Sequence, residues 1–226
     1  MNARLLPDSV EVFLQSPVST SFRCKMAANS LDIDVEKKSI HHLKISGINI
    51  PDNWNVGIIY GASGSGKTTL AKKLFGENVF KIGVDESKPI IEQFAESFNY
   101  DECASMLNGI GLTSVPCWIR PVSTLSNGQR SRAEAALLMS QDGLTVIDEW
   151  TSVVDRTVAK AMSHCVQKFA KKNNKQIILL SCHNDIIEWV KPDWVIDCNK
   201  QEFQLPVSPE FFFAQESKLH FQLSEW

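Results

Sequence analysis

The stretch 61–69 constrains the fold of this chain more than any other part of the sequence. It reads Gly-Ala-Ser-Gly-Ser-Gly-Lys-Thr-Thr and fits the phosphate-binding loop pattern GxxxxGK[ST]. The apolar run 56–60 before it predicts a buried strand, and the run 69–75 after it, closed by Gly76, predicts a helix. The sequence therefore predicts a strand, a phosphate loop and a helix in direct succession.

The glycines of this loop allow successive backbone N–H groups to point inward, and the helix that follows adds the partial positive charge of its N-terminus. Lys67 is expected to reach the β- and γ-phosphates of a nucleotide, and the Thr68 hydroxyl to reach a Mg²⁺ ion. The alternative interpretation is a glycine-rich turn that binds nothing. The residues predicted to contact nucleotide are Gly61, Ala62, Ser63, Gly64, Ser65, Gly66, Lys67, Thr68 and Thr69.

Length and composition exclude several classes of protein. At 226 residues the chain can form one large domain, or a domain with appendages. A net charge of -3 at pH 7 gives no electrostatic sign of a surface for nucleic acid or anionic membrane. The 6 cysteines include no CxxC pair, which argues against a zinc site and a disulfide framework. No secretory leader or membrane-spanning run is expected, so the predicted location is the cytoplasm.

The N-terminal region contains short runs that alternate apolar and polar positions, which predicts antiparallel strands. The clearest of these runs are 10–13, 21–26 and 43–45. Beyond the phosphate loop, 79–82 is predicted to be another strand. Two short helices are predicted within 89–111, the second capped by Asp101 and ending near Gly109.

The second half of the chain alternates helices and strands in the order typical of a parallel sheet. Asp148 and Glu149 follow one predicted strand, and His183 stands just beyond another, at the edge where ligands collect in such sheets. The predicted fold is α/β, with a mainly parallel core sheet, an N-terminal antiparallel β region and a small helical lobe at about 87–141. The predicted elements lie at 127–140, 144–147, 155–172, 176–181 and 195–197, with a further helix after Asn184.

Residues 125–129, which read Leu-Ser-Asn-Gly-Gln, come directly before a strongly helical stretch at 130–139. Small polar residues at a helix N-terminus are well suited to bind an anion. The sequence therefore contains a second candidate anion site.

With these motifs in this order, the chain resembles the nucleotide-binding domain of ATP-binding cassette (ABC) ATPases from about residue 40 to about residue 200. The resemblance implies a P-loop NTPase fold of the ABC type, with ATP held between two head-to-tail subunits. It makes 61–69 the Walker A loop, 125–129 the signature, 144–149 Walker B, 152–155 the D-loop and His183 the switch histidine.

The resemblance also implies catalytic roles for residues of one subunit. Thr68 and Asp148 would hold Mg²⁺, and Glu149 would act as general base on the attacking water. Lys67 and His183 would contact the γ-phosphate. ATP and Mg²⁺ are therefore the expected cofactors, and ATP hydrolysis is the expected reaction.

Further residues are implied to act across the subunit interface. Ser126, Gly128 and Gln129 would cap the γ-phosphate of ATP bound to the other subunit, and Asp155 would cross the interface. Asn127 replaces the first glycine of the family's signature, and asparagine also tolerates unusual backbone angles. An ATP-dependent homodimer is therefore expected.

The chain departs from transporter ATPases of the family in two respects: the segment between Walker A and the signature is compact, and a glutamine is missing. Their glutamine after the strand that here ends near Ile82 is absent, and 84–86 reads Val-Asp-Glu; only Gln93 is near, inside a predicted helix. The residue that stacks on adenine is not evident either. Phe22 and the pair His41 and His42 are its candidates.

Within the family, the chain is most similar to a soluble branch that is often fused to a predicted acetyltransferase domain and is also found in phage-type genomes. The similarity lies in 118–130, 148–156, 181–183 and 192–194. It implies a conformational switch in a nucleic-acid, defence or phage-related process. The alternatives are the ATP-binding subunit of an ABC transporter and, third, a P-loop small-molecule kinase.

The predicted ATPase domain spans 1–205, and an aromatic C-terminal extension follows at 206–226. The extension contains Phe211, Phe212, Phe213 and Trp226. It is predicted to pack on the core as a strand or hairpin, or else to dock a further protein partner.

Overall fold

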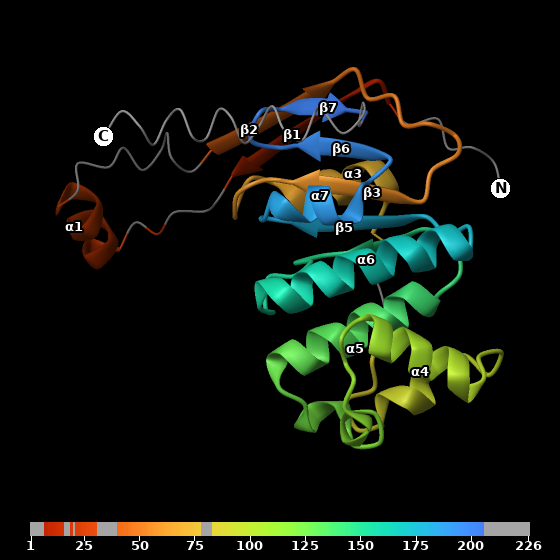
Figure 1. The fold of residues 1–226 in the computed structure, drawn as a ribbon. Helices are drawn as coiled ribbons and strands as arrows, with labels where there is room; N and C mark the ends of the chain where they lie inside the picture. The colour runs from red at the N-terminus through yellow and green to blue at the C-terminus, as the bar shows by residue number, and fades with distance from the viewer. Residues whose placement is uncertain (1–6, 16–18, 20, 31–39, 78–82, 206–226) are drawn as a thin grey trace, which may run out of the picture.

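The computed structural model describes residues 7–15, 19, 21–30, 40–77 and 83–205. The strand predicted at 79–82 and the extension at 206–226 therefore lie outside the described residues. The described chain is organised by a 7-stranded sheet with the order β1-β2-β7-β6-β3-β5-β4 (Figure 1). The strands are β1 (Ser9–Gln15), β2 (Ile40–Ser46), β3 (Val56–Tyr60), β4 (Thr145–Ile147), β5 (Ile177–Ser181), β6 (Trp194–Asp197) and β7 (Glu202–Gln204).

The sheet has a parallel core and an antiparallel N-terminal part, as the sequence predicts. β3 pairs in parallel with β5 on one side and β6 on the other, and β4 pairs in parallel with β5. β1 and β2 pair antiparallel along their length, and β7 runs antiparallel to β6. The predicted α/β fold class is thus confirmed.

Helices cover both faces of this sheet and form a lobe beside it (Figure 1). Among the residues that the structure describes, no helix is both long enough and apolar enough to span a membrane. The α-helices are α1 (Phe22–Ser30), α3 (Lys67–Phe75), α4 (Tyr100–Gly109), α5 (Asn127–Ser140), α6 (Arg156–Lys172) and α7 (Asp185–Val190). The 3-10 helices are η2 (Ile90–Gln93), η3 (Val115–Cys117) and η4 (Val122–Thr124).

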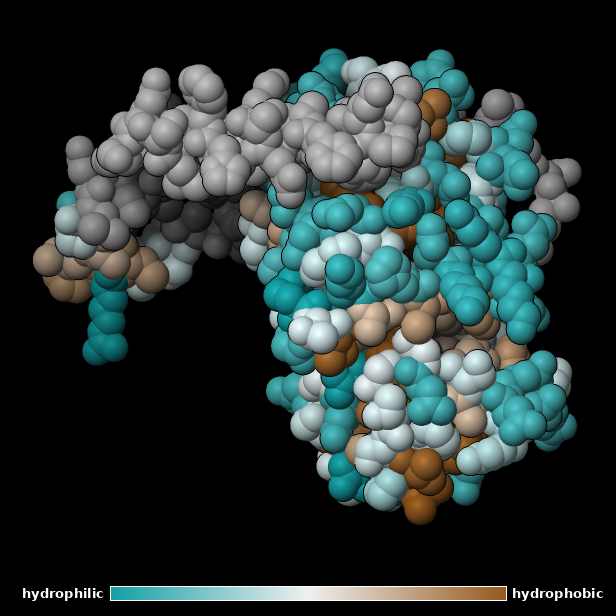
Figure 2. Space-filling view, in the orientation of Figure 1, coloured by the Kyte–Doolittle hydropathy of each residue, from teal (hydrophilic) through white to brown (hydrophobic). Residues whose placement is uncertain are grey.

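Residues 22–26 of the strand predicted at 21–26 instead belong to helix α1, so that prediction is wrong. β1 and β2 pair directly with each other, and the segment between them is rich in the helix formers Lys, Met and Ala. None of the residues of α1 is buried. Phe22 is 77% exposed and Met26 56%. Figures 1 and 2 show α1 apart from the body of the molecule, with apolar side chains on its surface.

Helix α4 begins at Tyr100 because Asn99, rather than the predicted Asp101, is its N-cap. The Asn99 side chain accepts a hydrogen bond from the Glu102 backbone N–H at 3.0 Å, and the Glu102 carboxylate accepts from the Asn99 backbone N–H at 2.9 Å. This reciprocal capping box satisfies two backbone donors at once. The predicted end near Gly109 agrees with the structure.

The sheet separates two apolar cores, because successive side chains of a strand point to opposite faces. Ile58 of β3 packs on the face covered by α4, α5 and α6, and its neighbour Ile59 packs on the face covered by α3. Both side chains are fully buried. The phosphate loop that follows β3 is therefore held by packing on both sides of its strand.

One close contact inside the second core constrains β3. A Cβ atom added at Gly57 would lie 2.0 Å from a ring carbon of the fully buried Trp194. The Trp194 ring is itself packed against Trp54 and Phe75, with centroids 5.3 and 6.0 Å away. The ring therefore has no room to move away from a side chain at position 57.

We expect Gly57→Ala to lower the free energy of unfolding by about 1–3 kcal/mol, because the added methyl group overpacks a closed core. Denaturant unfolding would measure this loss. Gly83→Ala is the matched control, since no described atom lies within 4 Å of a Cβ there. An equal effect of the two substitutions would contradict the packing argument.

Candidate functional site

The backbone carbonyl groups of the Walker A loop bind the lysine of the same loop. Gly66 has a φ of 91°, a left-handed conformation that favours glycine, and it ends the loop directly before α3. The Lys67 ammonium donates to the carbonyl groups of Gly61 and Ala62, both at 2.8 Å. A phosphate in the loop would therefore compete with these two carbonyl groups for the ammonium.

The turn that follows β6 contacts the Walker A loop and supports it. The Asn199 side-chain carbonyl accepts from the Ala62 backbone N–H at 2.9 Å. The neighbouring Cys198 is buried beneath Gly61, and burial raises the pKa of its thiol to about 12. Sequence reasoning missed these two supporting residues, although the sequence places them just beyond a strand predicted to lie in the same sheet.

Thr68 and Asp148 meet at the carboxyl edge of the sheet, although they are far apart in sequence. The Thr68 hydroxyl donates to a carboxylate oxygen of Asp148 at 2.7 Å. Hydroxyl and carboxylate oxygens are the hard donors that Mg²⁺ prefers, and this ion keeps several waters when it binds. The pair therefore fits the predicted Mg²⁺ site.

Glu149 sits on a strained turn after β4. Its φ is 53°, and that of Thr151 is 65°, so two non-glycine residues adopt left-handed backbone conformations. Such conformations cost on the order of 1–3 kcal/mol each and cluster at functional sites. The Glu149 carboxylate is exposed and accepts from the Ser152 hydroxyl at 2.6 Å. The turn thus presents a carboxylate to solvent beside Asp148.

A buried tryptophan anchors this turn and links it to the loop that carries His183. The backbone N–H of Trp150 donates to the carbonyl of Leu180 at 2.8 Å, and its ring is almost fully buried. The Ser181 hydroxyl donates to the carbonyl of Trp150 and accepts from the backbone N–H of His183, each at 3.1 Å. One buried hydroxyl therefore connects the Walker B turn to the switch loop.

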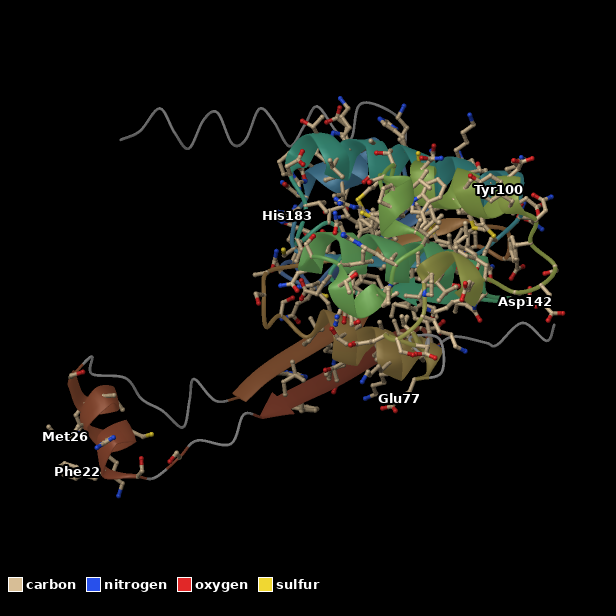
Figure 3. The ribbon with its side chains drawn as sticks, turned by 90° about the horizontal axis from the view of Figure 1, so that it is seen from below. Phe22, Met26, Glu77, Tyr100, Asp142 and His183 are labelled. Carbon is tan, nitrogen blue, oxygen red and sulfur yellow. The ribbon has the colours of Figure 1, made fainter. Side chains whose placement is uncertain are left out.

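His183 lies at the same edge of the sheet as the Walker A loop and Asp148. It follows β5, whereas Asp142 precedes β4, and Figure 3 shows the two residues on opposite sides of the body. The register pairs Tyr60, which precedes the Walker A loop, with Ser181. The parallel strands thus bring the Walker A loop and the switch loop together.

The signature begins helix α5, as the sequence predicts. Ser126 is its N-cap: the hydroxyl accepts from the Gln129 backbone N–H at 3.3 Å, and the Gln129 side chain accepts from the Ser126 backbone N–H at 3.1 Å. Asn127 is the first residue of the helix and has no left-handed φ, so its substitution for glycine requires no unusual backbone angle. A Cβ at Gly128 would lie 3.1 Å from the Val153 carbonyl, which places the signature against the D-loop of its own chain.

Asp155 ends the D-loop and caps helix α6. Its carboxylate accepts from the Val158 backbone N–H at 3.0 Å. The carboxylate is exposed. A contact between Asp155 and a second subunit stays a prediction.

The loop at 84–93 is stabilised by hydrogen bonds within itself and by an ion pair with the signature helix. The side-chain oxygen of Gln93 accepts from the backbone N–H of Asp85 at 2.8 Å, and its nitrogen donates to the carbonyls of Asp85 and Lys88. Arg130, in the first turn of α5, donates to the Glu86 carboxylate at 3.0 Å. Gln93 lies in the 3-10 helix η2 and holds this loop together.

The residues predicted as candidates for stacking on adenine lie in different parts of the structure. Phe22 lies on the exposed helix α1, apart from the body (Figure 3). The His42 ring stacks on Phe13 at 4.3 Å between centroids, and Leu14, the residue after Phe13, packs near Gly66. Because successive side chains of a strand point to opposite faces, Phe13 and His42 lie on the face away from Gly66, and the residue that stacks on adenine stays a prediction.

The comparisons with known proteins agree with this geometry. The chain matches no family model. It is 27% identical over 200 residues to the energy-coupling factor transporter ATP-binding protein EcfA1 of Leuconostoc mesenteroides subsp. mesenteroides, and the match covers 72% of this chain and 74% of that protein.

Solved structures with the same fold include a dimeric bacterial ABC transporter cassette, with a TM-score of 0.54 and 15% identity over 76% of this chain and 92% of that one. An archaeal ribosome recycling factor, solved in complex with a ribosomal stalk protein, matches with a TM-score of 0.57 and 21% identity over 69% of this chain. The chain spans only 34% of that factor's length. The chain therefore has the fold of ABC ATPase cassettes and is similar in sequence to a transporter ATP-binding protein.

Proposed function

We propose that the chain binds ATP and Mg²⁺ and hydrolyses ATP in a head-to-tail homodimer that acts as a conformational switch. The observation that carries this proposal is the contact between Thr68 and Asp148, with the exposed carboxylate of Glu149 one residue away. A metal-binding pair beside an exposed carboxylate is what attack of water on a phosphate requires.

In the proposed reaction, the triphosphate lies along the Walker A loop and draws the Lys67 ammonium away from its two carbonyl partners. Mg²⁺ would neutralise charge on the β- and γ-phosphates. Glu149 accepts a proton from the attacking water as the bond between the γ-phosphorus and the bridging oxygen breaks, which yields ADP and phosphate. His183 donates a hydrogen bond to the γ-phosphate.

The proposed dimer places the signature of one subunit over the ATP of the other. The capping box at Ser126 and Gln129 fixes the N-terminus of α5, whose partial positive charge favours a phosphate. A dimeric ABC cassette among the structural neighbours supports this arrangement. The proposed ATPase domain is 1–205, with 206–226 as an extension, and the proposed location is the cytoplasm.

The work coupled to hydrolysis has two candidates. The relative that is a transporter ATP-binding protein favours a transporter subunit. The Gln93 side-chain amide is hydrogen-bonded to the backbone of Asp85 in its own loop. This favours a role outside transport, in a nucleic-acid, defence or phage-related process, because the amide is already engaged within the chain. Co-purification of the chain with a membrane protein would support the first candidate, and ATPase activity independent of such a protein the second.

We expect Glu149→Gln to bind ATP normally but to turn it over about 100-fold more slowly or worse, because the shape is kept while the base is lost. Phosphate release and nucleotide titration would measure the two effects. Glu188→Gln, the same change at an exposed residue of α7, is the control. Near-normal turnover of Glu149→Gln would place the base elsewhere.

Substitutions at Ser126 should separate its two roles. Ser126→Ala removes the cap of α5 and should cost about 1 kcal/mol of stability as well as activity. Ser126→Asp keeps a good cap but brings a carboxylate toward the γ-phosphate, so stability should be retained while activity is lost. Thermal unfolding and ATPase assays would test this, with Ser123→Ala as the control. An active Ser126→Asp variant would contradict a contact with phosphate.

Mixing two inactive variants should restore some hydrolysis. Lys67→Ala damages the Walker A side of a site, and Ser126→Arg damages the signature side. In a head-to-tail heterodimer one composite site carries both lesions and the other carries neither, so up to one site of two is intact. Differential tagging would confirm the heterodimers. Heterodimers that remain inactive would count against the head-to-tail dimer, because a signature that acts within its own chain leaves every site damaged.

A further inference from the structure

Two links join the Walker B turn and D-loop to the switch loop. On the inner side, the Ser181 hydroxyl bridges the carbonyl of Trp150 and the backbone N–H of His183. On the outer side, Arg156, the first residue of α6, pairs with Asp185, the first residue of α7. The Arg156 Nε donates to one Asp185 oxygen at 2.9 Å, and Nη2 donates to the other. This two-point pair fixes the starts of both helices relative to each other.

The guanidinium of Arg156 also stacks on Trp189, with its central carbon 4.9 Å from the ring centroid. Asp185 and Trp189 are four residues apart on one face of α7, so this face offers both an acceptor and a ring to the same guanidinium. A planar fork can use both at once, whereas the point charge of a lysine cannot. The site is therefore specific for arginine.

We propose that Arg156 is a positioning residue that makes the D-loop and the switch histidine move as one unit. Arg156 directly follows Asp155, the end of the D-loop, and Asp185 lies two residues after His183. A displacement of the D-loop by a second subunit is thus passed through the ion pair to the loop that carries His183. The inference rests on the proposed function, because it requires that His183 contact the γ-phosphate during hydrolysis.

The test is a double-mutant cycle on the purified full chain with Arg156→Ala, His183→Ala and the combined variant. We expect Arg156→Ala to lower kcat about 10- to 100-fold, as expected for a misplaced catalytic group, with little change in KM for ATP. The combined variant should be no slower than His183→Ala alone, because residues that act as a unit are not additive. Lys160→Ala, which removes an exposed cation from the same helix, should leave kcat unchanged.

Arg156→Lys provides the same cycle if the alanine variant does not fold, since it keeps the charge and loses the fork and the stacking. An unchanged kcat in the folded Arg156 variants would overturn the inference, and so would a combined defect equal to the product of the single defects. Both results would leave the proposed function intact, provided that the unsubstituted chain hydrolyses ATP and Glu149→Gln does not. A chain without ATPase activity would overturn both.

Discussion

The parallel pairing of β3 with β5 on one side and β6 on the other is the constraint on which the site depends. The register places Tyr60 opposite both Ser181 and Asp197. Because parallel strands end at the same edge, three chain segments then emerge side by side: the Walker A loop, the switch loop and the supporting turn of Asn199. β4 extends the same edge and brings Asp148 within hydrogen-bond distance of Thr68.

The loops at this edge are exposed where they would meet ligand and anchored where they meet the core. Glu149 is exposed, while the next residue, Trp150, is almost fully buried and hydrogen-bonded to the strand beside it. Such an anchor can hold the two left-handed residues of the turn in place, since strain persists only where the surrounding structure over-determines it. Asn199 similarly anchors the Walker A loop, because its side chain accepts a hydrogen bond from the backbone N–H of Ala62.

The helical lobe is joined to the loop at 84–93 by specific polar contacts. The Glu86 carboxylate pairs with Arg130 of the signature helix, and the Glu86 carbonyl accepts from the Ser123 backbone N–H at 2.9 Å. A shift of this loop would therefore be felt at the start of α5. The contact between this loop and the signature helix is thus made by Glu86 and Arg130, whereas Gln93 stabilises the loop by hydrogen bonds to the backbone of Asp85.

The local pattern of the sequence was sufficient to predict most elements and the α/β fold of ABC cassettes. The GxxxxGK[ST] loop, the strand at 56–60 and the helix after 125–129 depend on residues close in sequence, and the structure agrees with each. The strand prediction at 21–26 was wrong because an alternating pattern over a few residues does not exclude a short, exposed helix. The prediction of Asp101 as the cap failed because Asp and Asn are both good capping residues, and only the backbone geometry shows that Asn99 is the cap.

Contacts between distant segments were decided by the tertiary structure alone. The sequence indicates that Thr68, Asp148, Glu149 and His183 carry chemistry, because these residue types stand at strand ends in a recognisable order. The sequence alone does not indicate which contacts hold the loops of these residues in place, since those contacts depend on strand register and helix packing. The Ser181 bridge, the Asn199 hydrogen bond and the Arg156 pair with Asp185 therefore became visible only when the sheet had brought their partners together.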